Sequence, residues 1–152
     1  MKNRTPFVLT SVLLVLFAAG HSYGFLAVKP TSAEGLAVLS SMHSVTFTIG
    51  HGVHSYWDFY LGFGLFISVY LLLAAVLAWE LPRVREASYE TYVVLAYALL
   101  AAQAIETLLC WLYFRGPPMV LSTVVMACLA WGIIVAARDR THVLRPSSSI
   151  PE

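Results

Sequence analysis

Four long apolar runs separated by short polar links restrict this chain to very few folds. Inside the hydrocarbon of a bilayer every backbone N–H and C=O group must be hydrogen-bonded within the protein, so a spanning run is either a helix or part of a closed barrel. About 20 apolar residues suffice for a helix to cross. We therefore predict an all-α, integral membrane four-helix bundle with spans at about residues 7–28, 57–81, 89–114 and 119–137.

The composition supports this membrane class. Charged residues make up 11% of the chain, whereas a soluble domain carries roughly 25%. A formal net charge of +1 offers no basic surface for a phosphate backbone, so we expect the lipid bilayer and no nucleic acid as partner. A homo-oligomer is left open. We interpret Cys110 and Cys128, both within apolar runs, as small buried hydrophobes.

The first span allows two interpretations. Lys2 and Arg4 precede an apolar stretch that ends in small residues, and this pattern over residues 7–20 also describes a cleaved signal peptide. Apolar character resumes at residues 23–28, however, and the total length then suits a retained membrane helix. We favour the retained helix.

Residues 31–55 form an outer segment between the first two spans. Thr31 or Ser32 is suited to cap a helix. The apolar residues that follow share one face with His43, and serines occupy the other, which predicts an amphipathic helix at the membrane interface. Residues 45–48 alternate as a strand does, but we expect no strand there, because a lone strand in a membrane has unpaired edges.

Prolines and charges are expected to end the later spans. Pro82 would end the second span and open a charged link to Ala87, and residues 115–118 would form a tight turn. Arg138-Asp139-Arg140 would stop the fourth span. This leaves a single membrane domain over residues 1–137 and a cytoplasmic tail over 138–152, which has nothing to bury.

The distribution of basic residues predicts the orientation. One set of links and ends carries seven of them, and the other carries only Lys29 and Arg115. By the positive-inside rule, we expect both termini to lie in the cytoplasm. The seven are Lys2, Arg4, Arg83, Arg85, Arg138, Arg140 and Arg145.

The stretch from Gly50 to Leu65, at the outer end of the second span, concentrates polar and aromatic groups. On a helix, His51, His54 and Asp58 would lie near one face, and Asp58 would be placed to accept the imidazole N–H of His54. Other polar groups fall in the outer half of the first and third spans. Together they form a candidate ligand-binding site of His21, His51, His54, Trp57, Asp58, Gln103 and Glu106.

Three chemistries suit these residue types. Imidazole and carboxylate groups bind zinc or iron. A haem takes two axial histidines, here His21 with His51 or His54. A proton-handling or quinone site uses a histidine beside a carboxylate. A simpler explanation is that these groups face water at a helix end, where the helix dipole also stabilises the negative charge of Asp58. No metal motif such as HExxH is present, so metal, cofactor and catalytic residues are left unassigned.

Glu106 is the strongest anomaly, because it lies within the third span. Insertion scales put a central aspartate at about 2.5–3.5 kcal/mol, and the helix neighbours of Glu106 offer no cation. We expect its carboxyl group to be protonated, hydrogen-bonded to Gln103 or Thr107, or opposite His21. It would either tie two helices together or act as an acid or base.

Three sequence stretches carry a resemblance to known proteins. SYWDFYLGFGLF, with SMHSVTFTIGHGVHS and GHSYGF before it, resembles small four-helix bacterial inner-membrane proteins, over most of the chain up to about Trp131. That resemblance implies fold and location but no catalytic residue. The order of spans is also loosely similar to DoxX-like proteins and to EXPERA bundles, in which buried carboxylates act on a lipid-like ligand. AQAIETLLCWLYF, with Gln103 and Glu106, is similar to that arrangement, whereas the first helix departs from it.

These observations leave three functions open. The leading hypothesis is a membrane protein that binds a small apolar or amphipathic ligand in an outer polar pocket. The first alternative is a haem- or metal-binding redox protein that uses His21, His51 and His54. The second is a lipid-modifying enzyme with Glu106 as acid or base.

Overall fold

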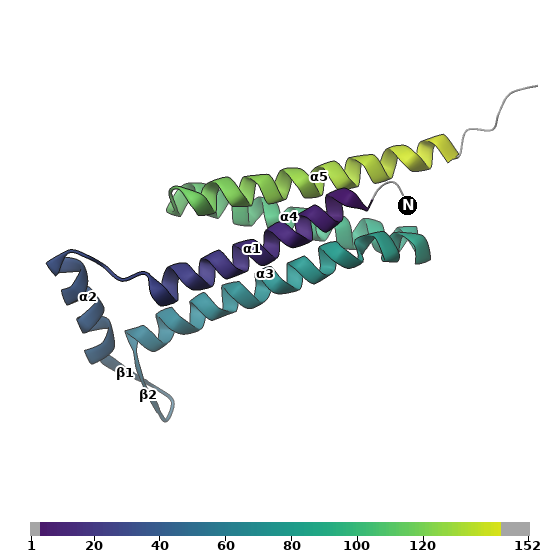
Figure 1. Cartoon of the computed structure of the whole chain (residues 1–152). Helices are drawn as coiled ribbons and strands as arrows, with labels where there is room; N and C mark the ends of the chain where they lie inside the picture. The colour runs from purple at the N-terminus through teal and green to yellow at the C-terminus, as the bar shows by residue number, and fades with distance from the viewer. Residues whose placement is uncertain (1–3, 144–152) are drawn as a thin grey trace, which may run out of the picture. The chain divides into compact units, whose positions relative to one another are not determined.

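The computed structural model describes residues 4–143 and contains five helices and one hairpin in that range (Figure 1). Four of the helices are long and apolar enough to cross a membrane, so the predicted all-α class is confirmed and the chain is a multi-pass membrane protein. The elements are α1 (Thr5–Ala27), α2 (Ala33–Ser44), β1 (Thr46–Ile49), β2 (Gly52–Ser55), α3 (Tyr56–Ala87), α4 (Tyr89–Tyr113) and α5 (Pro117–Val143).

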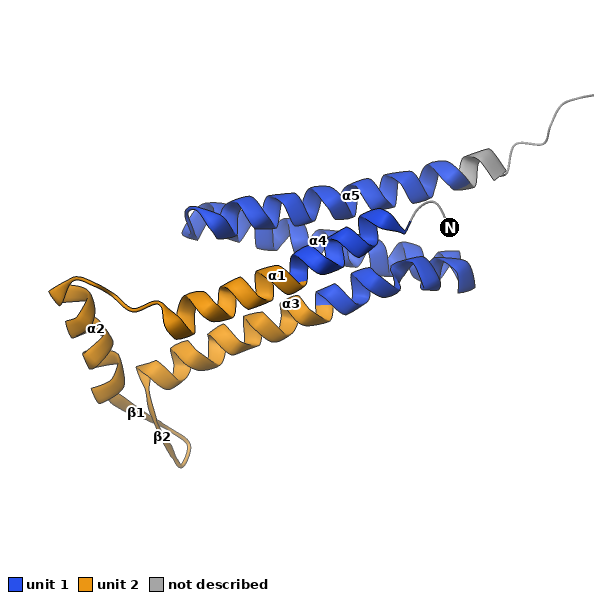
Figure 2. Ribbon diagram, in the orientation of Figure 1, with its two compact units in different colours: residues 1–14, 74–152 blue, residues 15–73 orange. Residues whose placement is uncertain are grey.

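The chain divides into two compact units, coloured separately in Figure 2. Unit 1 comprises residues 1–14 and 74–152, of which 4–14 and 74–143 are described, and unit 2 comprises residues 15–73. Helices α1 and α3 each contribute to both units. Each unit has its own set of contacts.

Unit 1 has the larger apolar core. At the start of α1 the ring of Phe7 meets Tyr92 of α4 edge-on, with 6.3 Å between the ring centroids. The same ring lies against Gly132 of α5, where an added Cβ would come within 3.0 Å of it. Small residues elsewhere in this core allow helices to approach closely, as they do in membrane proteins generally. The buried apolar side chains are Phe7, Leu14, Ala75, Ala78, Leu81, Tyr92, Ala96, Leu99, Cys110, Val125, Leu129, Ile133 and Ala136.

Ion pairs gather several chain segments at one end of unit 1. Arg4, just before α1, lies 3.1 Å from Glu86 near the end of α3. Arg85 lies 3.4 Å from Asp139 of α5. These pairs show that the start of α1, the end of α3 and the charged part of α5 lie close together.

Three predicted helix boundaries are wrong. Helix α3 continues through Pro82 to Ala87, because the fixed φ of proline suits a helix even though its missing N–H removes one bond. Helix α5 begins already at Pro117, a favoured first helical position, and the charged triplet that begins at Arg138 does not end it. The triplet is compatible with a helix, because arginine is a good helix former and is favourable near a helix C-terminus.

Other predicted boundaries match the structure. Ser32 caps α2 by accepting from the N–H of Gly35 at 3.0 Å, and Ser88 caps α4 by accepting from that of Thr91 at 3.3 Å. The turn before α5 contains Gly116, whose φ of 80° favours glycine. Residues 144–152 of the predicted tail, with Arg145, lie outside the described residues, as does Lys2.

Unit 2 is held together by a close contact between α1 and α3. Gly64 of α3 is buried, and a Cβ at this position would lie 2.8 Å from Cε2 of Phe25 on α1. Four residues further along α3, the Ser68 hydroxyl lies 2.8 Å from that of Ser22. A glycine at the point of contact with a polar pair beside it is a common way for membrane helices to associate.

The outer segment contains a hairpin where no strand is expected from sequence. β1 and β2 pair antiparallel, with Phe47 opposite His54 and Ile49 opposite Gly52. Gly50 takes the first turn position with φ 59°, which is the pattern of a II′ turn. The expectation is wrong because it treated residues 45–48 as a lone strand, whereas residues 52–55 supply the partner.

The contact at Gly64 predicts a difference between two glycines of one helix. Gly64→Ala and Gly62→Ala gain the same helix propensity, but only Gly64 has a neighbour within 4 Å of an added Cβ. Because overpacking costs about 1–3 kcal/mol, Gly64→Ala should be destabilised by about that amount relative to Gly62→Ala. Reversible unfolding of the purified protein in mixed SDS micelles measures the difference. Equal stabilities would show that Phe25 does not press on Gly64.

Candidate functional site

The site residues predicted from sequence divide between the two units. His21, His51, His54, Trp57 and Asp58 belong to unit 2, and Gln103 and Glu106 belong to unit 1. Their convergence on one pocket therefore stays a prediction, and the surroundings of each are described within its own unit.

His21 takes part in the contact between α1 and α3. Its Nε2 lies 3.2 Å from the carbonyl oxygen of Gly64, and its ring centroid is 5.1 Å from that of Phe25. A carbonyl oxygen only accepts, so Nε2 carries the proton, and Nδ1 is the acceptor that remains in the neutral ring. Its side chain is half-buried. His21 is thus a structural contact that keeps one nitrogen for a further partner.

His51 and His54 lie on the hairpin and not on a helix. His51 is exposed in the turn, and His54 stands on β2 beside Phe47, with 6.5 Å between ring centroids. The imidazole of His54 folds over Gly52, where an added Cβ would lie 2.6 Å from its Nε2. The predicted common helical face of His51, His54 and Asp58 is wrong, because α3 begins only at Tyr56.

Asp58 caps the helix that follows the hairpin. Its Oδ2 accepts from the N–H of Ser55 at 2.7 Å and from the Ser55 hydroxyl at 2.8 Å. The Ser55 hydroxyl in turn accepts from the N–H of Asp58 at 3.1 Å. This reciprocal pair is a capping box with aspartate in place of glutamate. The carboxylate therefore binds Ser55 and not His54.

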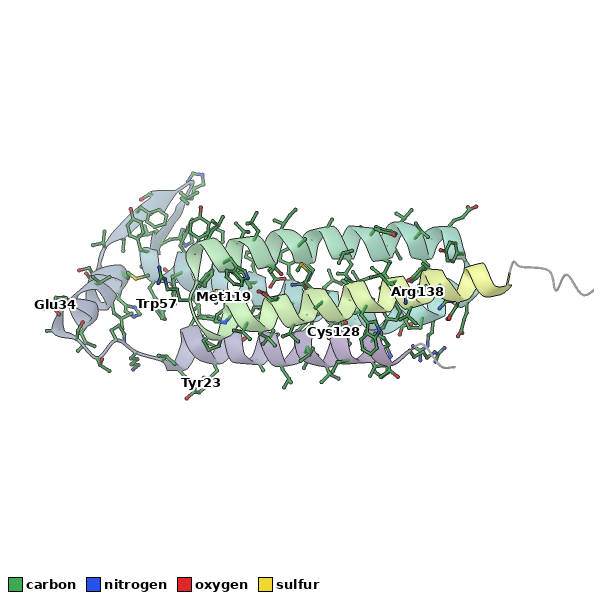
Figure 3. All side chains as sticks on the ribbon, turned by 90° about the horizontal axis from the view of Figure 1, so that it is seen from above. Tyr23, Glu34, Trp57, Met119, Cys128 and Arg138 are labelled. Carbon is green, nitrogen blue, oxygen red and sulfur yellow. The ribbon has the colours of Figure 1, made fainter. Side chains whose placement is uncertain are left out.

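Trp57 links α2 to α3 within a row of rings. Its ring centroid is 4.6 Å from that of His43 on α2 and 5.4 Å from that of Tyr60, one turn further along α3. Tyr60 meets Phe25 of α1 at 6.3 Å, and Phe25 meets His21. We call these five side chains the histidine–aromatic row. Figure 3 labels Trp57 at the start of α3 and Glu34 at the start of α2.

The sequence-based site leaves out Phe25, Tyr60 and His43 of this row, and His43 is the histidine among them. The signal for His43 is present, because helical spacing puts it on the apolar face of residues 33–44. On this face the imidazole of His43 packs against the ring of Trp57 at the start of α3. Without the hairpin, nothing in the sequence brings His43 near Trp57.

Glu106 lies in unit 1 and has the partner expected from sequence. Its Oε2 accepts from Nε2 of Gln103 at 2.9 Å, and Gln103 is buried while Glu106 is half-buried. Thr107 does not bind the carboxylate: its hydroxyl contacts the carbonyl oxygens of Gln103 at 2.8 Å and of Ser122 on α5 at 3.2 Å. Thr107 therefore joins α4 to α5, a role considered for Glu106. In Figure 3, Met119, Cys128 and Arg138 follow one another along α5.

Within residues 4–143 no group of three or more His, Cys, Asp and Glu side chains is placed to hold a metal ion. Cys110 and Cys128 are both free thiols. Comparisons with protein-family models, with curated proteins and with solved structures give no match. The site must therefore be interpreted from its own geometry.

The capping role of Asp58 predicts that loss of its side chain destabilises the protein, whereas loss of the His54 side chain does not. Asp58→Ala should lower the melting temperature of the purified protein, because the N–H of Ser55 loses its acceptor. Asp58→Glu should restore most of that loss, since glutamate is the usual residue of a capping box.

His54→Ala is the matched control for this test. It should leave the melting temperature near that of the unaltered protein, because the imidazole is exposed and no hydrogen bond joins it to Asp58. An equal loss in Asp58→Ala and His54→Ala would instead favour an interaction between the two side chains.

Proposed function

We propose that this protein binds a small amphipathic molecule along the histidine–aromatic row of unit 2, at the outer surface of the inner membrane. The observation that carries this proposal is the row itself, because it joins three helices through ring contacts of 4.6–6.3 Å. It brings apolar ring faces and two imidazoles together at one helix end.

The row offers two kinds of contact to such a ligand. Tyr60 is 45% exposed, and Trp57 and Phe25 are half-buried, so an apolar chain or ring has aromatic surface to lie on. His43 is exposed, and His21 keeps Nδ1 as an acceptor, so a polar head would find hydrogen-bonding groups at either end. Binding sites of small molecules commonly combine an apolar wall with a few polar groups.

The orientation we propose puts both termini in the cytoplasm and unit 2's hairpin outside. The ion pairs of Arg4 with Glu86 and of Arg85 with Asp139 support a common side for the start of α1 and the charged part of α5. Basic residues are enriched in that region, as in cytoplasmic links of membrane proteins. The α4–α5 turn, by contrast, carries only Arg115.

Binding along the row predicts saturable quenching of Trp57 by a brominated lysophospholipid, the amphipathic probe. Trp79, Trp111 and Trp131 are exposed and are replaced by phenylalanine, so that Trp57 alone reports. Tyr60→Leu or Phe25→Leu should weaken probe binding at least about tenfold, which corresponds to loss of one buried aromatic contact of about 1.4 kcal/mol. Competition with the unbrominated lipid separates binding from collisional quenching.

Phe66→Leu is the control for this experiment. Phe66 is an aromatic residue of α3 that is 62% exposed and lies outside the row, so its loss should not change the affinity. Equal weakening by Phe66→Leu, or quenching that never saturates, contradicts a site at the row. A Soret band in the purified protein would favour the haem alternative instead.

The proposed orientation predicts which positions react from outside the cell. In a background with Cys110 and Cys128 replaced by alanine, His51→Cys at the exposed hairpin turn should react with a membrane-impermeant maleimide in intact spheroplasts. Glu86→Cys, at the end of α3, should react only after lysis. The reverse pattern of labelling would place the hairpin in the cytoplasm.

A further inference from the structure

The two faces of the hairpin differ in chemistry. Side chains of a strand alternate between faces, and cross-strand partners share one. The register therefore puts Phe47, Ile49 and His54 on one face and Val53 on the other, together with Thr46, Thr48 and Ser55. The first face carries the large apolar side chains of Phe47 and Ile49 and the imidazole of His54, whereas the second carries mainly hydroxyl groups.

The first face continues into the aromatic surface of α3. The ring centroid of Phe47 is 5.0 Å from that of Tyr56 and 5.0 Å from that of Phe59. The ring centroids of Phe59 and Phe63 are 5.6 Å apart. The exposed rings of α3 then follow at spacings of four, three and four residues, which places them on one side of the helix. They are Phe59, Phe63, Phe66 and Tyr70, with exposed fractions of 39%, 62%, 62% and 67%.

This aromatic surface is separate from the histidine–aromatic row. At 3.6 residues per turn, the mean direction of Trp57 and Tyr60 around α3 lies about a third of a turn from the mean direction of Phe59 and Phe63. α3 is a candidate membrane span, so its exposed rings face lipid. The hairpin face that touches them is thus joined to the lipid-facing side of the protein.

Charge also favours a lipid surface over water beside the hairpin. No Lys, Arg, Asp or Glu occurs from Val45 to Trp57, a stretch of 13 residues that includes both strands. Ile49 remains 54% exposed next to the turn. The unpaired strand edges exclude the hairpin from the hydrocarbon core, but the interfacial region supplies water and head groups to satisfy them.

We propose that the hairpin lies on the surface of the leaflet at which α3 begins, with Phe47, Ile49 and His54 turned toward lipid. The Thr46, Thr48 and Val53 face is turned toward water. The hairpin is then an interfacial anchor that holds the entrance of α3 at the level of the lipid head groups. This assignment does not depend on a ligand at the histidine–aromatic row.

Ile49 and Val53 provide a matched pair to test it. They flank the same turn, are both exposed, and lie on opposite faces. Ile49→Cys and Val53→Cys are made in the full chain with Cys110 and Cys128 replaced by alanine, labelled with NBD and reconstituted in phosphatidylcholine vesicles. A lipid with a doxyl group at carbon 5 of its acyl chain is the quencher from the membrane, and iodide is the quencher from water.

We expect doxyl lipid to quench the label of Ile49→Cys at least about twofold more than that of Val53→Cys, and iodide to show the opposite order. Phe66→Cys is the positive control for doxyl quenching. Equal quenching of the two hairpin labels by both agents overturns the proposal, as does strong iodide quenching at position 49. If a second copy of the chain covered the hairpin, neither agent would quench the label at position 49, while doxyl lipid would still quench the label of Phe66→Cys. That outcome also overturns the proposal.

Should labelling at position 49 disturb the hairpin, unlabelled variants give an independent measurement. Ile49→Trp and Val53→Trp, with the four native tryptophans replaced by phenylalanine, report the same two faces through their emission maxima in vesicles. A bluer maximum for Ile49→Trp is expected, and coincident maxima contradict the proposal.

Discussion

The demand that backbone polar groups be satisfied without water governs most of this structure. In the apolar runs each N–H can find its acceptor only within its own helix, so even Gly64, a residue of low helix propensity, is held within the 32-residue helix α3. The same demand explains where the strands occur. The hairpin uses the residues between α2 and α3, and its outer edges need the water or head groups that the membrane core lacks.

The long helices could be predicted from sequence because their signal is additive over many residues. The hairpin cannot be predicted from residues 45–48 alone, because a strand is stable only with a partner. A signal for it is nevertheless present in the sequence: two short runs with β-branched residues flank a two-residue turn that opens with Gly50. Missing this pairing also put His54 and Asp58 on a helix that starts after the first of them.

The candidate site shows the same limit more strongly. The contact of Gln103 with Glu106 is local, at a spacing of three residues on one helix, and sequence alone identifies it. The contacts of His21 with Gly64 and of His43 with Trp57 join different elements. Their side chains meet because a glycine admits Phe25 and because the hairpin returns the chain toward α2. Contacts of this kind, between different elements, depend on tertiary packing, for which a single sequence carries no direct signal.

The link between α3 and α4 has a mechanical consequence. Ser88 alone separates the two helices, and it is occupied as the cap of α4. At about 1.5 Å per residue α3 is about 48 Å long, well beyond the roughly 30 Å of a hydrocarbon core, so it must lean or protrude in a bilayer. Because Ser88 is the whole link, the start of α4 is tied to the end of α3, and a shift of that end along the membrane normal moves the start of α4 with it.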